Sequence, residues 1–62
     1  MDEYKVVVYD NYTDKYYATK SIVDNYYDGV IETIAAAKAN RSKAALVQDG
    51  RIVYIYAGSN KQ

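Results

Sequence analysis

The chain contains no cysteine, histidine, proline, tryptophan or phenylalanine. Without cysteine it can form neither a disulfide nor a thiolate metal site. Without histidine and cysteine it also lacks a side chain whose ordinary pKa suits proton transfer near pH 7 and a thiolate nucleophile. The remaining serine and threonine hydroxyls fall in cap, turn or strand positions, where structural roles are typical. The sequence therefore predicts a protein that is not an enzyme and that needs no cofactor or metal ion.

Long hydrophobic runs are also absent. The 62 residues are 50% hydrophobic and 26% charged, and no apolar stretch approaches the roughly 20 residues that a membrane-spanning helix requires. The opening Met-Asp-Glu has the wrong charge for a secretory signal peptide. A chain of this length has room for one core. We therefore expect one soluble, cytoplasmic domain over residues 1–62, with residues 58–62 as a frayed polar tail.

Charges of both signs are present in equal number but are unevenly distributed. Residues 1–32 contain seven acidic and three basic side chains, a net charge of −4, whereas residues 33–62 contain one acidic and five basic side chains, a net charge of +4. Part of this separation suits a helix, because carboxylates stabilise a helix start and cations stabilise its end. A pI near 6.1 and an acidic amino-terminal half disfavour a nucleic-acid backbone as the main partner.

Two segments near the amino terminus have the composition of β-strands. Tyr4–Tyr9 and Lys15–Ile22 are rich in β-branched and aromatic residues, and turn-forming residues 10–14 separate them. They predict an antiparallel hairpin. Its register stays open, because a slip of one residue would exchange Tyr16 and Tyr17 between the two faces.

Between Asp24 and Asn40 the spacing of apolar residues becomes that of an amphipathic helix. Either Ser21 or Asp24 can cap its start, and Asn40 fits a left-handed terminating position. Gly29 leaves a second interpretation open, in which regular helix begins only after Asp28. On this spacing one stripe of the helix consists of Val23, Tyr27, Val30, Ile31, Ile34 and Lys38.

Asp49-Gly50 between two apolar runs predicts a two-residue type I′ turn that joins residues 44–48 to residues 51–56. Counting outward from this turn fixes the expected cross-strand pairs and two faces. The face assigned to the helix and the core carries Ala44, Leu46, Val53 and Ile55. The face expected to stay uncovered carries Ala45, Val47, Ile52, Tyr54 and Tyr56.

Together these elements predict the α+β class, with a ββαββ chain that forms a four-stranded sheet and one helix packed on one face. Two strand orders remain open. In one, the first and fourth strands pair in parallel at the centre, as in the β-grasp arrangement. In the other, the two hairpins are joined differently and the helix connection is still right-handed.

Tyrosine is the abundant residue, with nine copies. Each copy has a hydroxyl group that requires water or a hydrogen-bond partner. In a structural interpretation, some tyrosines lie at the border of a small core: Tyr4, either Tyr16 or Tyr17, and Tyr27. In a functional interpretation, five residues form an uncovered patch: Tyr9, Tyr54, Tyr56, Ile52 and Val47. Such a patch has the composition of interface hot spots.

One further pattern covers nearly the whole chain. Its residues are Lys5-Val6-Val7, Thr19-Lys20, Ile22, Asp28, Ala37, Asn40, Asp49 and Val53. In this spacing the chain resembles the Dmd family of T-even-type bacteriophages, small antitoxins named for discrimination of mRNA degradation. Ile31 stands where the family has a tryptophan, and Asp49-Gly50 replaces a charged turn. The resemblance therefore leaves the role of an aromatic anchor to Tyr26 or Tyr27.

The resemblance implies a protein that binds and inhibits host endoribonuclease toxins of the RNase LS type, so that late phage mRNA survives. The expected partner is thus a protein in the host cytoplasm, without membrane or direct nucleic-acid contact. A ribonuclease has to present a basic RNA groove, and acidic side chains can enter it as phosphate substitutes. The acidic candidates are Asp10, Asp14, Asp24, Asp28 and Glu32. The candidates for the packed contact are Tyr26, Tyr27, Ile31 and Asn40, with Tyr54 and Tyr56 from the uncovered face.

Two other functions stay open. A single-stranded nucleic-acid-binding module would stack bases on an aromatic sheet, and its binding would fade steeply with salt. A self-associating subunit would form a homodimer through the tyrosine face or a sheet edge. Sedimentation distinguishes the dimer from a monomer that binds another protein.

Overall fold

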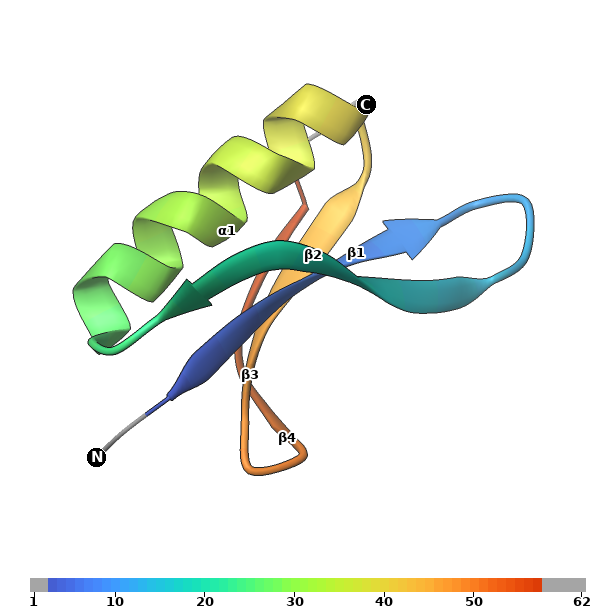
Figure 1. Ribbon diagram of the computed structural model, residues 1–62. Helices are drawn as coiled ribbons and strands as arrows, with labels where there is room; N and C mark the ends of the chain where they lie inside the picture. The colour runs from blue at the N-terminus through green and yellow to red at the C-terminus, as the bar shows by residue number, and fades with distance from the viewer. Residues whose placement is uncertain (1–2, 58–62) are drawn as a thin grey trace.

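The computed structural model of the chain, shown in Figure 1, describes residues 3–57. Its elements are β1 (Tyr4–Asp10), β2 (Lys15–Val23), α1 (Tyr26–Asn40), β3 (Lys43–Gln48) and β4 (Arg51–Ala57). The predicted ββαββ order, the four-stranded sheet and the single helix on one face are confirmed. The predicted tail over residues 58–62 lies outside the described residues. None of the helical structure within residues 3–57 has the length and apolar character needed to cross a membrane.

The strands lie in the order β2-β1-β3-β4, and each runs antiparallel to its neighbours. β1 and β3 form the centre of the sheet, where Lys5 lies opposite Val47 and Val8 lies opposite Ala44. The alternative in which the first and fourth strands pair in parallel is therefore wrong. Since β2 and β3 both run antiparallel to β1, they are parallel to each other, and α1 connects them (Figure 1).

The turn between β3 and β4 has the predicted geometry. Asp49 and Gly50 have φ angles of 53° and 77°, and a type I′ turn requires positive values at both central positions. The two residue pairs next to the turn also have the predicted register. The turn chemistry was therefore sufficient to locate this hairpin.

Beyond these two pairs the register differs from the prediction, because Val53 is the extra residue of a β-bulge. Leu46 consequently lies opposite Tyr54 instead of Val53. Paired residues share a face of the sheet, so Tyr54 and Tyr56 lie on the helix side of β4. Ile55 lies on the uncovered side. The predicted assignment of these residues to the two faces is thus wrong, and one inserted residue is the reason.

Asn25 caps the start of α1, rather than Ser21 or Asp24. Its side-chain oxygen accepts a hydrogen bond from the backbone N–H of Asp28 at 2.9 Å, and its amide nitrogen donates to the Asp28 carboxylate at 3.1 Å. This reciprocal pair satisfies one of the free N–H groups of the first turn and adds a side-chain bond between the two cap residues. Gly29 lies inside the helix, so the interpretation with a later start is also wrong.

The helix ends at Asn40, but the left-handed position is that of Arg41, with a φ angle of 52°. The backbone N–H of Arg41 donates to the carbonyl of Lys38 at 3.3 Å, and that of Ser42 donates to the carbonyl of Ala37 at 3.1 Å. These bonds satisfy carbonyls that the helix end would otherwise leave free. The prediction that Asn40 takes the left-handed conformation is therefore wrong by one residue.

α1 packs on the sheet through small side chains. Gly29, Thr33 and Ala37 are four residues apart and are all buried. At Gly29 the helix backbone lies so close to β3 that an added Cβ atom would be 2.7 Å from Cδ2 of Leu46. The buried Thr33 hydroxyl donates to the Gly29 carbonyl at 2.7 Å, which satisfies its hydrogen-bonding requirement inside the core.

This packing turns the helix away from the predicted orientation. Tyr27 and Ile31 belong to the predicted stripe, but they are 80% and 63% exposed. Lys38 of the same stripe is exposed as well. The physical reason is the close approach of Leu46, which requires the smallest residues of the helix to face the sheet.

The core is correspondingly small. Tyr4, Val6 and Leu46 form its buried centre. Partly buried apolar residues surround them: Val23, Val30, Ala36 and Tyr54. Tyr4, which was expected at the border, is only 9% exposed and belongs to the core itself.

The β1–β2 hairpin bends where β2 contains extra residues. Lys5 lies opposite Ile22 and Val7 lies opposite Ala18, so β2 has two residues more than β1 between these pairs. The Thr19 hydroxyl fills the gap in the ladder by donating to the Val6 carbonyl at 3.0 Å. The distal part of the hairpin projects from the rest of the molecule (Figure 1).

Candidate binding surfaces

The solvent-facing side of α1 is unusually apolar. Four exposed residues at intervals of four form a strip along it, which we call the helix ridge: Tyr27, Ile31, Ala35 and Ala39. A surface helix ordinarily presents polar and charged residues to water. Here the strip itself carries no charge, and the charged residues of the helix, Asp28, Glu32 and Lys38, lie beside it. The helix is therefore apolar on its outer side as well as its buried side, which is the character of a contact surface.

Three exposed carboxylates lie beside the helix ridge or just before the start of α1, and we call them the acidic border: Asp28 and Glu32 in the helix, and Asp24 before the Asn25 cap. Asp28 and Glu32 each follow a ridge residue in the sequence, so both lie on the same side of the strip. Glu32 accepts a hydrogen bond from the Ser21 hydroxyl at 3.3 Å, which shows that this side faces β2. The Ser21 hydroxyl thus anchors Glu32 instead of capping the helix.

A row of three tyrosine rings leads from the core to the helix ridge. The buried ring of Tyr4 lies 6.1 Å from that of Tyr26, edge to face at 67°. The Tyr26 ring in turn lies 6.2 Å from that of Tyr27, at 72°. Such edge-to-face pairs are favourable beyond their buried area. They support the exposed Tyr27 ring in a defined position, which lowers the entropy lost when a partner covers it.

The second candidate surface is the side of the sheet opposite α1, the open sheet face. Strand pairing places apolar side chains from all four strands on it: Val7, Ala18, Ile22, Ala45, Val47, Ile52 and Ile55. Ile22, Ile52 and Ile55 are 56%, 50% and 52% exposed. Tyr9 and Tyr16 pair at its hairpin end, with ring centroids 5.3 Å apart.

The open sheet face contains part of the predicted uncovered patch. Tyr9, Val47 and Ile52 lie there as expected, whereas Tyr54 and Tyr56 lie on the helix side and are half-buried. Tyr54 packs against the core. The two tyrosines of β4 are thus removed from the candidate patch, because the bulge at Val53 reversed their direction.

Polar bonds fix the hairpin end of this face. The Tyr9 hydroxyl donates to Oδ1 of Asp14 at 2.6 Å, and the Lys43 ammonium lies 4.5 Å from the centre of the Tyr9 ring. The hydrogen bond to Asp14 raises the pKa of Tyr9 above its ordinary value, because ionisation would break the bond and place two negative charges side by side. Asp14 has a φ angle of 57°, a conformation that Asp and Asn tolerate better than most residues.

We expect Asp14→Asn to lower the pKa of Tyr9. Asparagine tolerates the left-handed backbone at this position but removes the negative charge. An NMR titration of isotope-labelled tyrosine rings measures the change, with Tyr54 as an internal control on another strand. An unchanged Tyr9 pKa would mean that the hydrogen bond between the hydroxyl and Asp14 does not form in solution.

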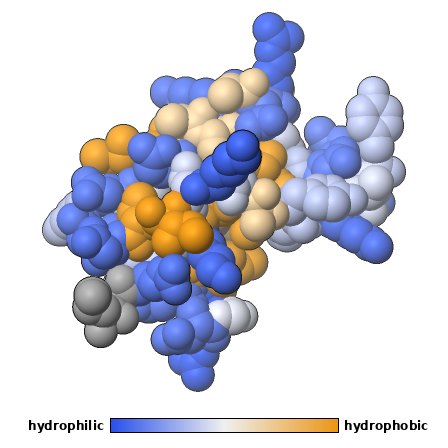
Figure 2. Space-filling model, viewed as in Figure 1, coloured by the Kyte–Doolittle hydropathy of each residue, from blue (hydrophilic) through white to orange (hydrophobic). Residues whose placement is uncertain are grey.

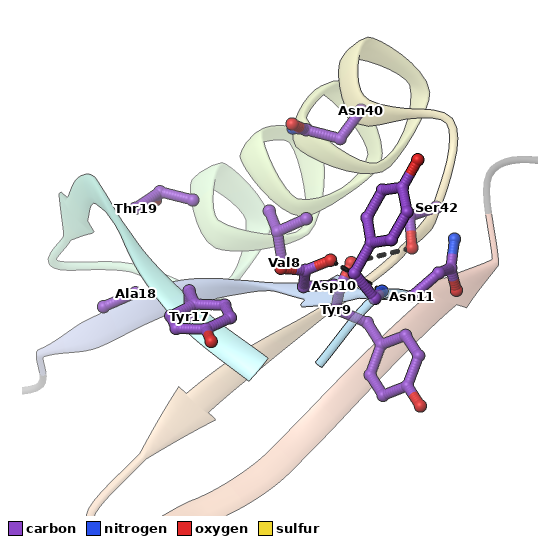
Figure 3. A pocket seen from close by; sticks show the side chains of 10 residues that line it. Val8, Tyr9, Asp10, Asn11, Tyr17, Ala18, Thr19, Asn40 and Ser42 are labelled. Carbon is purple, nitrogen blue, oxygen red and sulfur yellow. Dashed lines mark hydrogen bonds between the residues drawn. The ribbon is translucent and has the colours of Figure 1, made fainter. Parts of the chain in front are cut away.

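A cavity of about 430 Å³ lies between the projecting hairpin and the end of α1. Figure 3 shows Asn40, on the last turn of the helix, above Val8 and beside Ser42, with Thr19 on the neighbouring strand β2. The Asn40 amide nitrogen donates to the carbonyl of Ala36 at 2.8 Å, so its amide oxygen is the group that it can offer to a partner. The Ser42 hydroxyl donates to the Tyr9 carbonyl at 2.8 Å and joins the loop to β1.

Figure 2 shows one face of the molecule in space-filling form. Hydrophobic residues form patches between hydrophilic ones, and the projecting hairpin end is weakly hydrophilic. Within residues 3–57, no three side chains of the kinds that bind metal lie close enough together to hold an ion.

The predicted contact residues fall into three groups. Asp28 and Glu32 lie in the first half of α1 with Tyr26, Tyr27 and Ile31, and Asp24 lies just before this helix. Asn40 lies at the other end of the helix, about 20 Å away at 1.5 Å per residue. Tyr54 and Tyr56 lie on β4. Sequence reasoning missed Ile22 and Ile55 as surface residues. For Ile55 the reason is the bulge at Val53, because no residue pattern in β4 indicated an inserted residue.

Comparison of the chain with protein-family models, with curated proteins and with solved structures finds no match. The resemblance to the Dmd family therefore remains a prediction from the spacing of residues. Any function has to be argued from the surfaces themselves.

Proposed function

We propose that the protein inhibits an endoribonuclease toxin of the RNase LS type by binding to it, with the helix ridge and the acidic border as the contact. The observation that carries the proposal is the exposure of Tyr27 and Ile31 beside Asp28 and Glu32 on one side of α1, with Asp24 just before the helix. Aromatic and aliphatic anchors surrounded by complementary charge are the usual composition of a tight protein interface.

Charge complementarity supports a ribonuclease as the partner. An enzyme that cleaves RNA has to attract phosphates with cationic side chains, and carboxylates on an inhibitor meet the same cations. Asp28 and Glu32 are about 6 Å apart along the helix, at 1.5 Å per residue, and Asp24 lies just before the Asn25 cap.

The five candidate carboxylates lie too far apart for all of them to contact one groove. Asp10 and Asp14 lie at the far end of β1 from the start of α1, which is about 20 Å at 3.3 Å per residue. Both already have partners, since Asp10 accepts from the backbone N–H of Tyr12 at 2.9 Å and Asp14 accepts from Tyr9. The proposal therefore assigns the groove contact to Asp24, Asp28 and Glu32 alone.

Coexpression with an RNase LS-type toxin in bacteria tests the proposal. We expect Asp24→Lys with Glu32→Lys to abolish the rescue of growth, because the two reversals oppose the cationic groove and leave the Asn25–Asp28 cap intact. The matched control is Asp10→Lys with Asp14→Lys, which changes the net charge by the same amount at the other end of the molecule. We expect the control to retain full rescue.

Two results would contradict this assignment. Equal rescue by both double variants would show that the acidic border makes no contact with the toxin. Equal loss by both would show that rescue depends on total charge and not on the side of the helix. Binding of a labelled RNA single strand by the protein, reduced by salt, would instead favour a nucleic-acid-binding module.

A further inference from the structure

The molecule has two apolar surfaces without a partner, and they point in opposite directions. Gly29, Thr33 and Ala37 turn one side of α1 towards the sheet, so the helix ridge with Ile31 points away from it. The open sheet face, with Ile55, lies on the other side of the sheet. A contact that covers only one of these surfaces leaves the other in water.

The net charges beside the two surfaces are opposite in sign. Carboxylates form the acidic border of the helix ridge, whereas strand pairing and alternation place the side chains of Lys5 and Lys43 on the open sheet face. The only carboxylate within the four strands, Asp10, alternates with Tyr9 and thus lies on the helix side. Asp14, in the turn after β1, accepts a hydrogen bond from the Tyr9 hydroxyl at the hairpin end of the open sheet face, so this face has two lysines and one carboxylate. The ammonium position above the Tyr9 ring confirms the direction of Lys43.

We infer that copies of this chain associate head to tail, with the helix ridge of one copy on the open sheet face of the next. A symmetric contact between two sheet faces would oppose lysines to lysines, whereas one between two antiparallel helix ridges would bring Lys38 of one copy towards Asp28 of the other. Each would also leave one apolar surface uncovered. The head-to-tail arrangement covers both surfaces and pairs opposite charges.

The dimensions of the two surfaces are comparable. The helix ridge extends over about 18 Å along the helix axis from Tyr27 to Ala39, at 1.5 Å per residue, and Asp28 and Glu32 lie beside its first half. On the sheet, Lys43 lies next to the level of Tyr9, four residues from Lys5 along β1, which is about 13 Å at 3.3 Å per residue. Ala35 and Ala39 keep part of the ridge low, so a helix can approach a sheet closely there, as α1 does through Ala37 on the covered side.

A head-to-tail contact uses two different surfaces and therefore generates open chains or closed rings. One helix on one sheet face makes a small interface, so we expect association in the range from about 10 µM to about 1 mM. The contact would also compete with any other partner of the helix ridge. The inference does not rest on the proposed function, because its test contains only this protein.

Sedimentation velocity across this concentration range tests the inference with two variants at exposed sites. We expect Ile31→Asp, on the helix ridge, and Ile55→Asp, on the open sheet face, each to remain monomeric where the original protein assembles. Their equal mixture is the decisive sample. Ile55→Asp retains the helix ridge and Ile31→Asp retains the open sheet face, so the mixture should form a heterodimer and nothing larger.

A second pair of variants tests whether opposite charges contribute to the head-to-tail contact. We expect Lys5→Glu with Lys43→Glu, and separately Asp24→Lys with Glu32→Lys, to associate at least about tenfold more weakly than the original protein. Mixing the two restores opposite charges and should restore assembly. Circular dichroism and thermal unfolding of every variant show whether it is folded.

The inference is overturned if the original protein stays monomeric over the whole range. It is also overturned if the mixture of Ile31→Asp and Ile55→Asp forms no heterodimer. Self-association of Ile31→Asp to the same extent as the original protein would show a contact through a sheet face or edge between identical surfaces, and would contradict the head-to-tail arrangement.

Discussion

Replacing Leu46 with alanine should unfold much of the protein at room temperature. Leu46 is the largest fully buried side chain among the described residues and one of three in the buried centre of the core. Truncation of a buried leucine costs about 2–5 kcal/mol. A domain of this size rarely has more than about 3–5 kcal/mol of stability from its core. Chemical denaturation followed by circular dichroism measures the loss, and Val53→Ala, at an exposed site, is the control with a small expected effect.

The same site permits a test of how the helix is oriented. An added Cβ at Gly29 would lie 2.7 and 2.8 Å from the two terminal methyl groups of Leu46, so Gly29→Ala should destabilise the protein by about 1–2 kcal/mol despite the better helix propensity of alanine. Leu46→Val shortens the side chain that the new methyl group would meet. In that background Gly29→Ala should stabilise the protein by up to about 1 kcal/mol.

Ala35→Gly on the exposed side of α1 serves as the control, because it should cost about 1 kcal/mol in both backgrounds. A change of sign at Gly29 between the two backgrounds is specific to contact with Leu46. If Gly29→Ala had the same effect in both, the small residues of the helix would not face β3, and the helix ridge would not be exposed as described.

The largest expected effect on function is that of Ile31→Asp on toxin inhibition. Under the proposed function this exposed residue enters the centre of the interface, where removal of an anchor costs 2 kcal/mol or more and lowers affinity by roughly 30-fold. An aspartate there is also desolvated without a partner. The matched control is Ile52→Asp, the same substitution at an isoleucine of comparable exposure on the open sheet face. We expect the control to inhibit like the original protein.

A change in the opposite direction makes this prediction sharper. The predicted resemblance to the Dmd family implies a tryptophan at the position of Ile31. Because Ile31 is 63% exposed, a larger ring can be accommodated without repacking the core. We expect Ile31→Trp to strengthen inhibition, measured as the concentration that halves RNA cleavage. Weaker inhibition by Ile31→Trp together with full inhibition by Ile31→Asp would remove this residue from the interface.

Much of the fold could be predicted from local sequence patterns. Alternation and β-branched residues indicated the strands, and the change to helical spacing indicated α1. Asp49-Gly50 located the second hairpin because the type I′ turn needs residues that accept positive φ angles. The strand order could not be predicted, because it depends on which strands meet across the sheet and not on any local preference.

The errors came from packing, and they changed the candidate site. Counting apolar residues placed Tyr27 and Ile31 on the apolar stripe of the helix, but a close fit between Gly29 and Leu46 rotated the helix and exposed them. The bulge at Val53 has no sequence signature that distinguishes it from continuous pairing, and it moved the last part of β4 to the opposite face.

The most direct test of a purely binding role is a cleavage assay with a purified RNase LS-type toxin and a labelled RNA. We expect increasing amounts of this protein to stop cleavage at one-to-one stoichiometry, with a stable complex visible by sedimentation. The protein alone should leave the RNA intact. Undiminished cleavage at a large excess of the protein, or RNA degradation by the protein itself, would contradict the account.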